Sequence, residues 1–481
     1  MKLYRLCPLL AALALLVSPQ AGATSLLDAY RDALRSDPTL REAAANRNAT
    51  LEAKPQARAG LLPQLEATGS YQHQESSGTQ TFTTLAGDDV VTLSTGFRQE
   101  VEPNRSWQLR VTQTLFRWDQ WVALRQADKQ LAQAEAQFRA AEQDLMARVA
   151  RRYFDVLGAR ATLDAAEAAR EAIGRQLEQA EKRFEVGLSA ITDVQEARAS
   201  FDAATAGLIE AKRAYAVARE FLREITGEYY EDLADAGGDT PLITPDPADV
   251  EQWVEIALTR NLNLEAARLS AEISRDGIEL QRAGHYPTLE LFASRGNTRI
   301  TSERQTIPET LPGDPAPDPQ PFQPANSDSW QDAYGLQVRV PIYSGGAVAS
   351  NVREATFRHE ASQQQLERVA RETERATRDA YLSVTAEISR VQALAQAVES
   401  SETALRATEA GFEVGTRTTV DVLQSRRQLF EAQRDYANSR YTYLVNALRL
   451  KLAAGTLQEA DIALVDSWLK PAAEVPPPTQ P

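Results

Sequence analysis

A repeated stretch of sixteen residues constrains the fold of this chain more than any other feature. Residues 183–198 read RFEVGLSAITDVQEAR, and 228 positions later residues 411–426 read GFEVGTRTTVDVLQSR. In each copy a helical pattern runs into Val-Gly, turns, and restarts as a second helix headed by Asp193 or Asp421. If the two halves are equivalent, these turns lie at one end of a symmetric structure.

Further matches at nearly the same offset extend over almost the whole chain. Ala257-Leu258 repeats Ala33-Leu34 after 224 positions, and Tyr381 repeats Tyr153 after 228. A steady offset of this kind indicates an internal duplication. We therefore predict two structural repeats, residues 24–248 and 249–456. A C-terminal segment and a disordered, Pro-rich tail follow within residues 457–481.

Each repeat is predicted to contain one very long helix and shorter partners. Residues 119–185 hold no Pro and only two Gly, which favours one helix of about 100 Å, given a rise of ~1.5 Å per residue. Leu124, Leu131, Phe138 and Leu145 recur every seven positions, a period typical of left-handed supercoiling. The other principal helices are expected at residues 38–60, 192–226, 345–411 and 420–454.

Four stretches change to the two-residue period of a β-strand. Leu65, Ala67, Gly69 and Tyr71 alternate with polar residues, which gives one apolar and one polar face. The predicted strands are residues 64–73, 106–116, 288–296 and 333–343, and polar loops at residues 73–105 and 297–329 join them in pairs. Each strand suits a bilayer crossing, for which about 9 to 11 residues are needed.

Contact with a bilayer core must be made by these strands. After residue 23 no apolar run approaches the ~20 residues of a membrane-spanning helix. Four strands are too few to close, and an open sheet edge in lipid leaves costly unpaired backbone groups. A dimer would supply eight strands and a trimer twelve, and the residues alone do not choose. The alternative is a soluble β-layer packed on helices, but the chain offers no covering layer for it.

The N-terminal residues predict export from the cytoplasm. Residues 1–23 have a charged start, an apolar run and the small residues Ala21-Gly22-Ala23, which is typical of a signal peptide cleaved before Thr24. Cys7 is the only cysteine and lies within it, so no disulfide is expected in the mature chain. Loss of Lys2 and Arg5 takes the formal charge from −15 to −17, which argues against nucleic acid as a partner.

Nothing in the sequence supports catalysis or a cofactor. His73, His285 and His359 are the only histidines, and each is isolated, without metal-ligand spacing. Gly345-Gly346 lacks the rest of a phosphate-binding loop and is predicted to be a strand-to-helix junction. We therefore expect neither an enzyme nor a dedicated metal site.

The aspartates after the repeated turns have two interpretations. Asp193 and Asp421 both begin helices, where the helix dipole favours a carboxylate that bonds free N–H groups. Thr192-x-x-Gln195 and Thr418-x-x-Asp421 both match the capping box. From the residues alone, capping is favoured over a role in a pore.

These features resemble the TolC family of outer-membrane efflux and secretion channels over residues 24–470. The most specific pieces are the two repeated turns, LREITGEYY and VPIYSGG. The resemblance implies an α+β membrane protein that forms a homotrimer. Four strands per chain would contribute to a twelve-stranded transmembrane β-barrel, continuous with a periplasmic α-helical coiled-coil barrel. It also implies a location in the Gram-negative outer membrane and an iris-like gate at the helical tips.

The resemblance also implies the function and the partners. Such channels export small molecules, including drugs and toxic compounds, and proteins by type I secretion. They work passively with a periplasmic adaptor (membrane fusion) protein and an inner-membrane efflux pump or ABC secretion transporter. The competing hypothesis is a soluble periplasmic coiled-coil scaffold or adaptor, which would not fractionate with the outer membrane.

By position, the resemblance places a gate network at the helical tips. Its members are Gln176, Thr192, Asp193, Glu409 and Arg417, with Asp421 as a carboxylate ring that lines the constriction. The chain departs from the family twice, because Phe412 replaces the gate tyrosine and Gln424 replaces the second constriction aspartate. Arg417 is either simply solvated or holds neighbouring chains shut through bidentate bonds. We expect one ring of carboxylates, in place of two, to bind cations more weakly.

Overall fold

The structure is a computed structural model that describes residues 23–86, 89–237, 240–307, 318 and 320–470. It divides into two compact units. The first, here called the helical unit, comprises Met1–Asn48, Ala132–Leu269 and Gln364–Pro481, and the second, the strand unit, comprises Ala49–Leu131 and Ser270–Gln363. The predicted signal peptide, apart from Ala23, and the predicted tail after Lys470 lie outside the described residues.

The order of the principal elements is similar in the two halves of the chain. The first half contains α1 (Leu26–Ser36), α2 (Pro38–Leu51), α3 (Ala53–Ala59), β1 (Gln64–Ala86), β2 (Asp89–Phe116), α4 (Trp118–Glu185) and α5 (Ile191–Thr226). The second contains α6 (Val250–Arg260), α7 (Leu262–Arg282), β4 (Thr288–Ile307), β6 (Ser327–Arg339), α8 (Ala347–Glu413) and α9 (Thr419–Ala453). Shorter elements are β3 (Asp235–Ala236), η1 (Ala283–His285), β5 (Gln323–Pro324), α10 (Glu459–Asp466) and β7 (Leu469–Lys470). Helices, two strands and two further helices therefore follow one another twice, as a duplication predicts.

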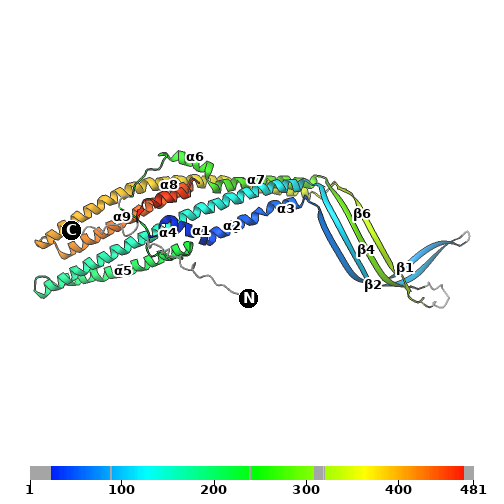
Figure 1. Ribbon diagram of the computed structural model, residues 1–481, viewed down its shortest axis with the longest axis horizontal. Helices are drawn as coiled ribbons and strands as arrows, with labels where there is room; N and C mark the ends of the chain where they lie inside the picture. Colours follow the sequence, from blue (N-terminus) through cyan, green and yellow to red (C-terminus); the bar gives the residue numbers. More distant parts are fainter. Residues whose placement is uncertain (1–22, 87–88, 238–239, 308–317, 319, 471–481) are drawn as a thin grey trace, which may run out of the picture. The chain divides into compact units, whose positions relative to one another are not determined.

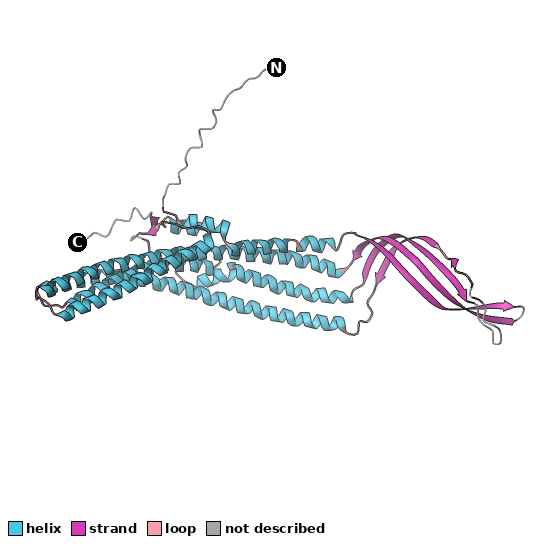
Figure 2. Cartoon of the chain, turned by 90° about the horizontal axis from the view of Figure 1, so that it is seen from below, coloured by secondary structure: helices cyan, strands magenta, loops and turns pink. Residues whose placement is uncertain are grey.

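The helical unit contains two hairpins, in which α4 turns into α5 and α8 turns into α9 (Figure 1, Figure 2). Tyr153 and Phe154 of α4 and Tyr443 of α9 are among the largest fully buried side chains of its core. The Tyr153 hydroxyl lies 2.9 Å from the Thr24 carbonyl oxygen and 2.8 Å from that of Ala234. Burial raises the pKa of Tyr153 well above its ordinary value, so the hydroxyl remains a donor. The Tyr153 hydroxyl therefore links Thr24, among the first described residues, to Ala234 in the segment before β3.

The predicted helix at residues 38–60 is divided into α2 and α3. Pro55 accounts for the break, because it has no N–H to donate to the Leu51 carbonyl and its ring crowds that oxygen. The four longer predicted helices, by contrast, begin and end within two residues of α4, α5, α8 and α9. Among the described residues, every helix falls short of the length or the apolar character that a bilayer crossing needs.

The strand unit contains an antiparallel sheet in the order β1–β2–β4–β6, and β5 also pairs with β4 (Figure 1). Leu65, Val111, Ala293 and Tyr334 lie opposite one another across the four strands and share one face. The next row turns Arg110 and its neighbours to the other face. The predicted alternation of apolar and polar faces is therefore seen in these two rows, whereas the row of Ala67 and Leu109 places Arg295 and Asp332 on the apolar face.

Three strands are longer than predicted at the end away from the helices. β1 runs to Ala86, β2 begins at Asp89 and β4 runs to Ile307, so the predicted polar loops contain paired strands. Neighbouring strands pair through backbone hydrogen bonds, which polar residues form as well as apolar ones. Apolar alternation in the sequence identifies only the residues that avoid water. β6 covers residues 327–339 in place of the predicted 333–343. It ends at Arg339 because Pro341 has no N–H to donate.

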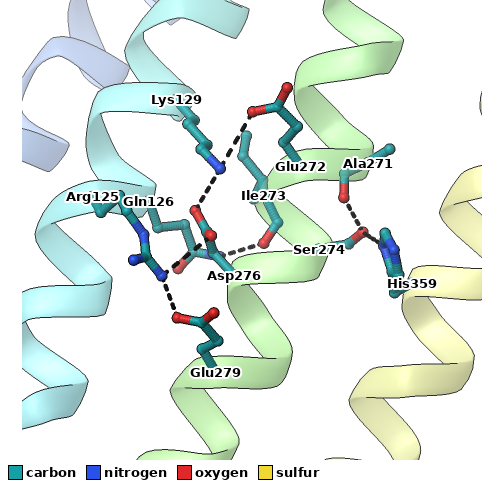
Figure 3. A network of polar contacts seen from close by, with 10 residues as sticks. All are labelled: Arg125, Gln126, Lys129, Ala271, Glu272, Ile273, Ser274, Asp276, Glu279 and His359. Atoms are coloured by element: carbon teal, nitrogen blue, oxygen red, sulfur yellow. Dashed lines mark hydrogen bonds and ion pairs between the residues drawn. The ribbon is translucent and has the colours of Figure 1, made fainter.

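A charged network joins α4 to α7 within the strand unit (Figure 3). The buried Asp276 carboxylate of α7 lies 2.9 Å from Nζ of Lys129 and 3.4 Å from Nη2 of Arg125. On another side of α7, the Ser274 hydroxyl lies 3.0 Å from Nδ1 of His359 on α8. Side chains of α4 and α8 therefore hold α7 in place, and His359 serves as a hydrogen-bond partner of Ser274.

Candidate functional site

The two repeated turns have the same backbone geometry. Gly187 and Gly415 both have φ of 76°, in the left-handed region that suits a residue without Cβ. The Gly187 N–H donates to the Phe184 carbonyl at 2.9 Å, and the next N–H donates to the Arg183 carbonyl at 2.8 Å. The equivalent bonds at Gly415 measure 3.1 and 2.8 Å. This pair of bonds is the Schellman motif, so Val-Gly ends the long helix in both repeats.

Side chains beside the turns connect the two hairpins. The Arg183 guanidinium, near the end of α4, lies 5.0 Å from the ring centroid of Phe412, near the end of α8. The quadrupole of an aromatic ring attracts a cation over its face, and this contact requires no hydroxyl group. Arg417 is exposed, and a Cβ on Gly411 would meet its Cγ at 2.8 Å. Glycine at position 411 therefore makes room for the Arg417 side chain.

Asp421 forms the predicted capping box with Thr418 at the start of α9. The Thr418 N–H and hydroxyl donate to Oδ2 of Asp421 at 2.8 and 2.9 Å, and the Asp421 N–H donates to Oγ1 of Thr418 at 3.2 Å. The bonds from Thr418, followed by the charge of Arg417, hold the pKa of Asp421 below its ordinary value. In a single chain, capping alone explains the position of this carboxylate.

The equivalent turn of the first repeat lacks the box, so the prediction for Thr192 and Gln195 is wrong. The N-cap residue of α5 is Ala190, which makes no side-chain capping bond, and Thr192 lies within the first helical turn. The box fails because alanine, with no side-chain oxygen, stands where the second repeat has Thr418. Asp193 still lies in the first turn, where the helix dipole favours its charge.

Two equivalent ion pairs, here called the hairpin clamps, join the legs of each hairpin near its turn. Arg426 of α9 donates to the Glu409 carboxylate of α8 at 2.6 Å. In the first repeat, Arg198 of α5 donates to Glu181 of α4 at 2.8 Å. The sequence carries the signal, because both repeated stretches end in an arginine that follows a glutamate by 17 positions. The predicted gate residue Glu409 therefore has a partner inside its own hairpin.

The other predicted gate residues do not meet within one chain. Gln176 is buried on α4, and Gln424 is exposed on α9. Over the part of the chain that the structure describes, no hydrogen bond or ion pair joins Gln176, Thr192 or Asp193 to either Glu409 or Arg417. Within the described part of one chain, these residues therefore form no gate network.

The turns present apolar side chains to solvent and show no metal site. Val186, Leu188 and Val414 are exposed at the two turns. Within the described ranges, no group of three or more His, Cys, Asp or Glu side chains could hold a metal ion. The chemistry available at this end of the hairpins is therefore packing, hydrogen bonding and charge.

Comparisons with known proteins show the family of the chain. The family described as "Outer membrane efflux protein" matches the chain twice, at residues 29–228 and 253–456. The outer membrane protein TolC of Vibrio cholerae is 36% identical over 472 residues, which cover 97% of this chain and 99% of that protein. TolC of Escherichia coli K12 is 37% identical, with 98% and 91% covered. The alkaline protease secretion protein AprF of Pseudomonas aeruginosa is 30% identical, with 95% and 90% covered.

Solved structures share the fold. The outer membrane protein VceC of Vibrio cholerae superposes with a TM-score of 0.68 at 21% identity, with 89% of this chain and 96% of that chain covered. CusC gives a TM-score of 0.70 at 19% identity, with 90% and 92% covered. The helical hairpins and the antiparallel sheet are thus a fold already seen in outer membrane channels.

Proposed function

Because the chain belongs to the outer membrane efflux protein family, we propose that three copies assemble into one channel through the outer membrane. Membership makes the protein a Gram-negative outer-membrane channel for efflux and secretion, and a transport protein rather than an enzyme. In the proposed homotrimer, four strands from each chain form one twelve-stranded transmembrane barrel. The long helices form a periplasmic tunnel that ends at the repeated turns.

The two open edges of the sheet carry this proposal. Among the described residues, β1 pairs only with β2 and β6 only with β4. Leu65 of β1 and Leu336 and Val338 of β6 expose their apolar side chains. Unpaired backbone groups in lipid would cost several kcal/mol each, whereas pairing β6 of one chain with β1 of the next removes both edges. Closure in a ring leaves the apolar face towards lipid and the polar face towards water.

Disulfide crosslinking tests the ring. The only cysteine, Cys7, lies in the predicted signal peptide, so cysteines introduced into the mature chain report without background. Single cysteines on β1 combined with single cysteines on β6 should give disulfide-linked trimers on oxidation, and unheated protein should migrate as a trimer. Cysteines on the central strand β2 are the matched control. A monodisperse monomer that remains soluble without detergent would end the proposal.

We propose that the trimer is a passive duct whose cargo is set by its partners. The family associates with efflux or secretion machinery, and the names of two relatives refer to protease secretion. Drugs, toxic compounds and secreted proteins would share the duct, delivered by an inner-membrane efflux pump or an ABC secretion transporter. The exposed apolar side chains at the turns, Val186, Leu188 and Val414, offer a surface to a periplasmic adaptor protein. A soluble scaffold is disfavoured, because the relatives place this chain in the outer membrane.

The gate is proposed to lie at the repeated turns, with Asp421 from each chain around the axis. Like charges that face one another raise each other's pKa and attract cations, whereas Thr418 lowers the pKa of Asp421 within its own chain. Arg417, exposed beside Asp421, is placed to bond an acidic group of a neighbouring chain. Phe412 packs under Arg183 and supplies a ring contact in the closed state.

Conductance in planar bilayers tests the gate. Asp421→Asn removes the charge but keeps an oxygen for the Thr418 N–H, whereas Asp421→Ala removes both. Both variants should weaken block by multivalent cations, because the ring loses its charge. Arg417→Ser should raise conductance by loosening the closed state. If Asp421→Asn is blocked as strongly as the wild type, the carboxylate only caps α9.

A further inference from the structure

Two aromatic pairs mark the two ends of a band along the strand unit. Trp118 and Tyr286 lie near the helices with ring centroids 6.4 Å apart, and Trp107 and Trp330 lie farther along the strands at 5.7 Å. Eleven positions separate Trp107 from Trp118. β2 covers nine of these positions, to Phe116, and at ~3.4 Å per residue and a tilt of roughly 40° they span about 23 Å, close to the ~25 Å apolar band of an outer-membrane barrel.

One row beyond the outer aromatic pair, two arginines stand directly opposite each other. The register places Arg105 of β2 against Arg299 of β4. Arg105 is two residues from Trp107, so both arginines lie on the face of the aromatic band. Tyr71 of β1 and Asp328 of β6 complete this row, here called the arginine row. Like charges directly opposite on neighbouring strands destabilise a sheet, so a bound anion would stabilise this row by offsetting the repulsion between the two arginines.

Asp328 neutralises only one of the two arginines. Nε and Nη2 of Arg299 donate to Oδ2 of Asp328 at 3.1 and 2.7 Å. The Arg105 guanidinium lies over the Tyr71 ring at 5.8 Å, and among the described side chains no carboxylate forms an ion pair with it. The row is exposed, and among the described side chains only Asp328 offsets its two positive charges.

We propose that the arginine row binds the phosphate groups of a phosphorylated glycolipid in the outer leaflet of the outer membrane. The inference rests on the proposed function, which turns this face of the sheet to lipid and its far end to the cell exterior. A phosphate between Arg105 and Arg299 would cancel their repulsion and accept the paired N–H groups that a guanidinium presents. Tyr71 adds the amphipathic ring that favours the headgroup level. The acyl chains would lie along the apolar band.

Titration with diphosphoryl lipid A, followed by native mass spectrometry of the detergent-solubilised protein, tests this site. Arg105→Gln and Arg299→Gln should each weaken binding about tenfold, as expected when a charged bidentate contact is lost. Arg110→Gln is the matched control, because Arg110 lies on β2 but on the opposite face. It should bind as the wild type does, and lipid A stripped of its phosphates should bind the wild type weakly.

Wild-type affinity in Arg105→Gln, or an equal loss in Arg110→Gln, would overturn the inference. Competition by inorganic phosphate as strong as that by lipid A would show a free-anion site and overturn the lipid assignment. Conductance in bilayers of phospholipid alone separates this site from the channel itself. A variant that conducts normally but no longer binds lipid A supports the site. A variant that binds lipid A as the wild type does would refute the site without contradicting the proposed channel.

Discussion

The Asp37 carboxylate ties the start of α2 to α4. It is 2% exposed, accepts the Leu40 N–H at 2.8 Å, and accepts two N–H groups of Arg148 at 2.9 and 3.2 Å. We expect Asp37→Asn to lower the free energy of unfolding by about 2 kcal/mol, because a charged acceptor is lost at a buried site. Denaturant titration followed by circular dichroism measures the change. Asp144→Asn is the matched control: Asp144 also binds Arg148, at 2.7 Å, but its side chain is 56% exposed, so the loss should be small.

The stabilisation by Asp37 should depend on pH. Burial raises the pKa of Asp37, but hydrogen bonds from Arg148 and Leu40 outweigh it, and the pKa lies below the ordinary 3.8. A group whose pKa is lowered by folding stabilises fully above its ordinary value and loses that contribution as the pH falls through the folded-state value. The difference between the wild type and Asp37→Asn should therefore shrink in strong acid. A difference that is the same at neutral and acidic pH would rule out this role.

Residues whose partners are near in sequence could be predicted, and those with distant partners could not. The helix start at Asp37-Pro38 and the capping box of Thr418 and Asp421 depend on neighbouring residues, so the local sequence is enough to predict them. Arg148 lies 111 positions from Asp37, and nothing in the sequence pairs them. The predicted box at Thr192 is an exception, because the pattern alone did not fix where α5 begins and its N-cap residue is Ala190.

Among whole elements, the α8–α9 hairpin should depend on its clamp. Glu409→Arg or Arg426→Glu places like charges where Arg426 now donates to Glu409 at 2.6 Å, and each should loosen the hairpin by about 1 kcal/mol. Backbone hydrogen exchange at residues 412–420 should then be faster. The double variant restores an opposite pair and should return exchange towards the wild-type rate. If the double variant exchanges as fast as the single variants, the clamp does not order the turn.

The end of α9 tests how closely two elements approach. Gly455 has φ of 69°, and a Cβ there would lie 2.4 Å from the Arg260 carbonyl oxygen at the end of α6. Gly415 has a similar φ of 76°, but nothing lies within 4 Å of its added Cβ. Both alanine variants pay the left-handed strain of roughly 1–2 kcal/mol. Gly455→Ala should cost about 2 kcal/mol more through the clash, measured as a lower melting temperature. Equal losses in the two variants would show that the backbone near Arg260 yields.

Element types followed from the sequence better than element ends. The four long helices were predictable to within two residues because an uninterrupted stretch without proline leaves few alternatives. The strands extend beyond the segments in which apolar residues alternate, because β1 and β2 stay paired to Ala86 and Asp89 through a polar stretch. The register that places Arg105 opposite Arg299 could not be predicted from the sequence either, since it joins strands from different repeats.

The duplication organises the whole chain and could be predicted from the constant offset of its repeats. The contacts between the first and the last described segments could not be predicted in this way. Oδ1 of Asp466 in α10 accepts the N–H groups of Leu26 and Leu27 at 2.7 and 3.3 Å and so caps α1 from 440 positions away. β7 pairs with β3, setting Leu469 against Ala236. The C-terminal segment has no counterpart in the first repeat, so the offset gave no sign of where it docks.

This docking predicts how truncation affects the molecule. A chain that stops after Thr456 loses Leu457, Ile462 and Val465, which are 1%, 0% and 4% exposed, and uncovers Leu26. Burial of such side chains contributes roughly 1.5–3 kcal/mol each, so the loss of about 5 kcal/mol should leave little folded protein in the outer membrane fraction. A chain that stops after Lys470 keeps every described contact and should melt at the wild-type temperature. Should both truncations melt alike, the C-terminal segment would not hold the N-terminal helix, and α1 would have to be stabilised by α5 and the buried Tyr153 alone.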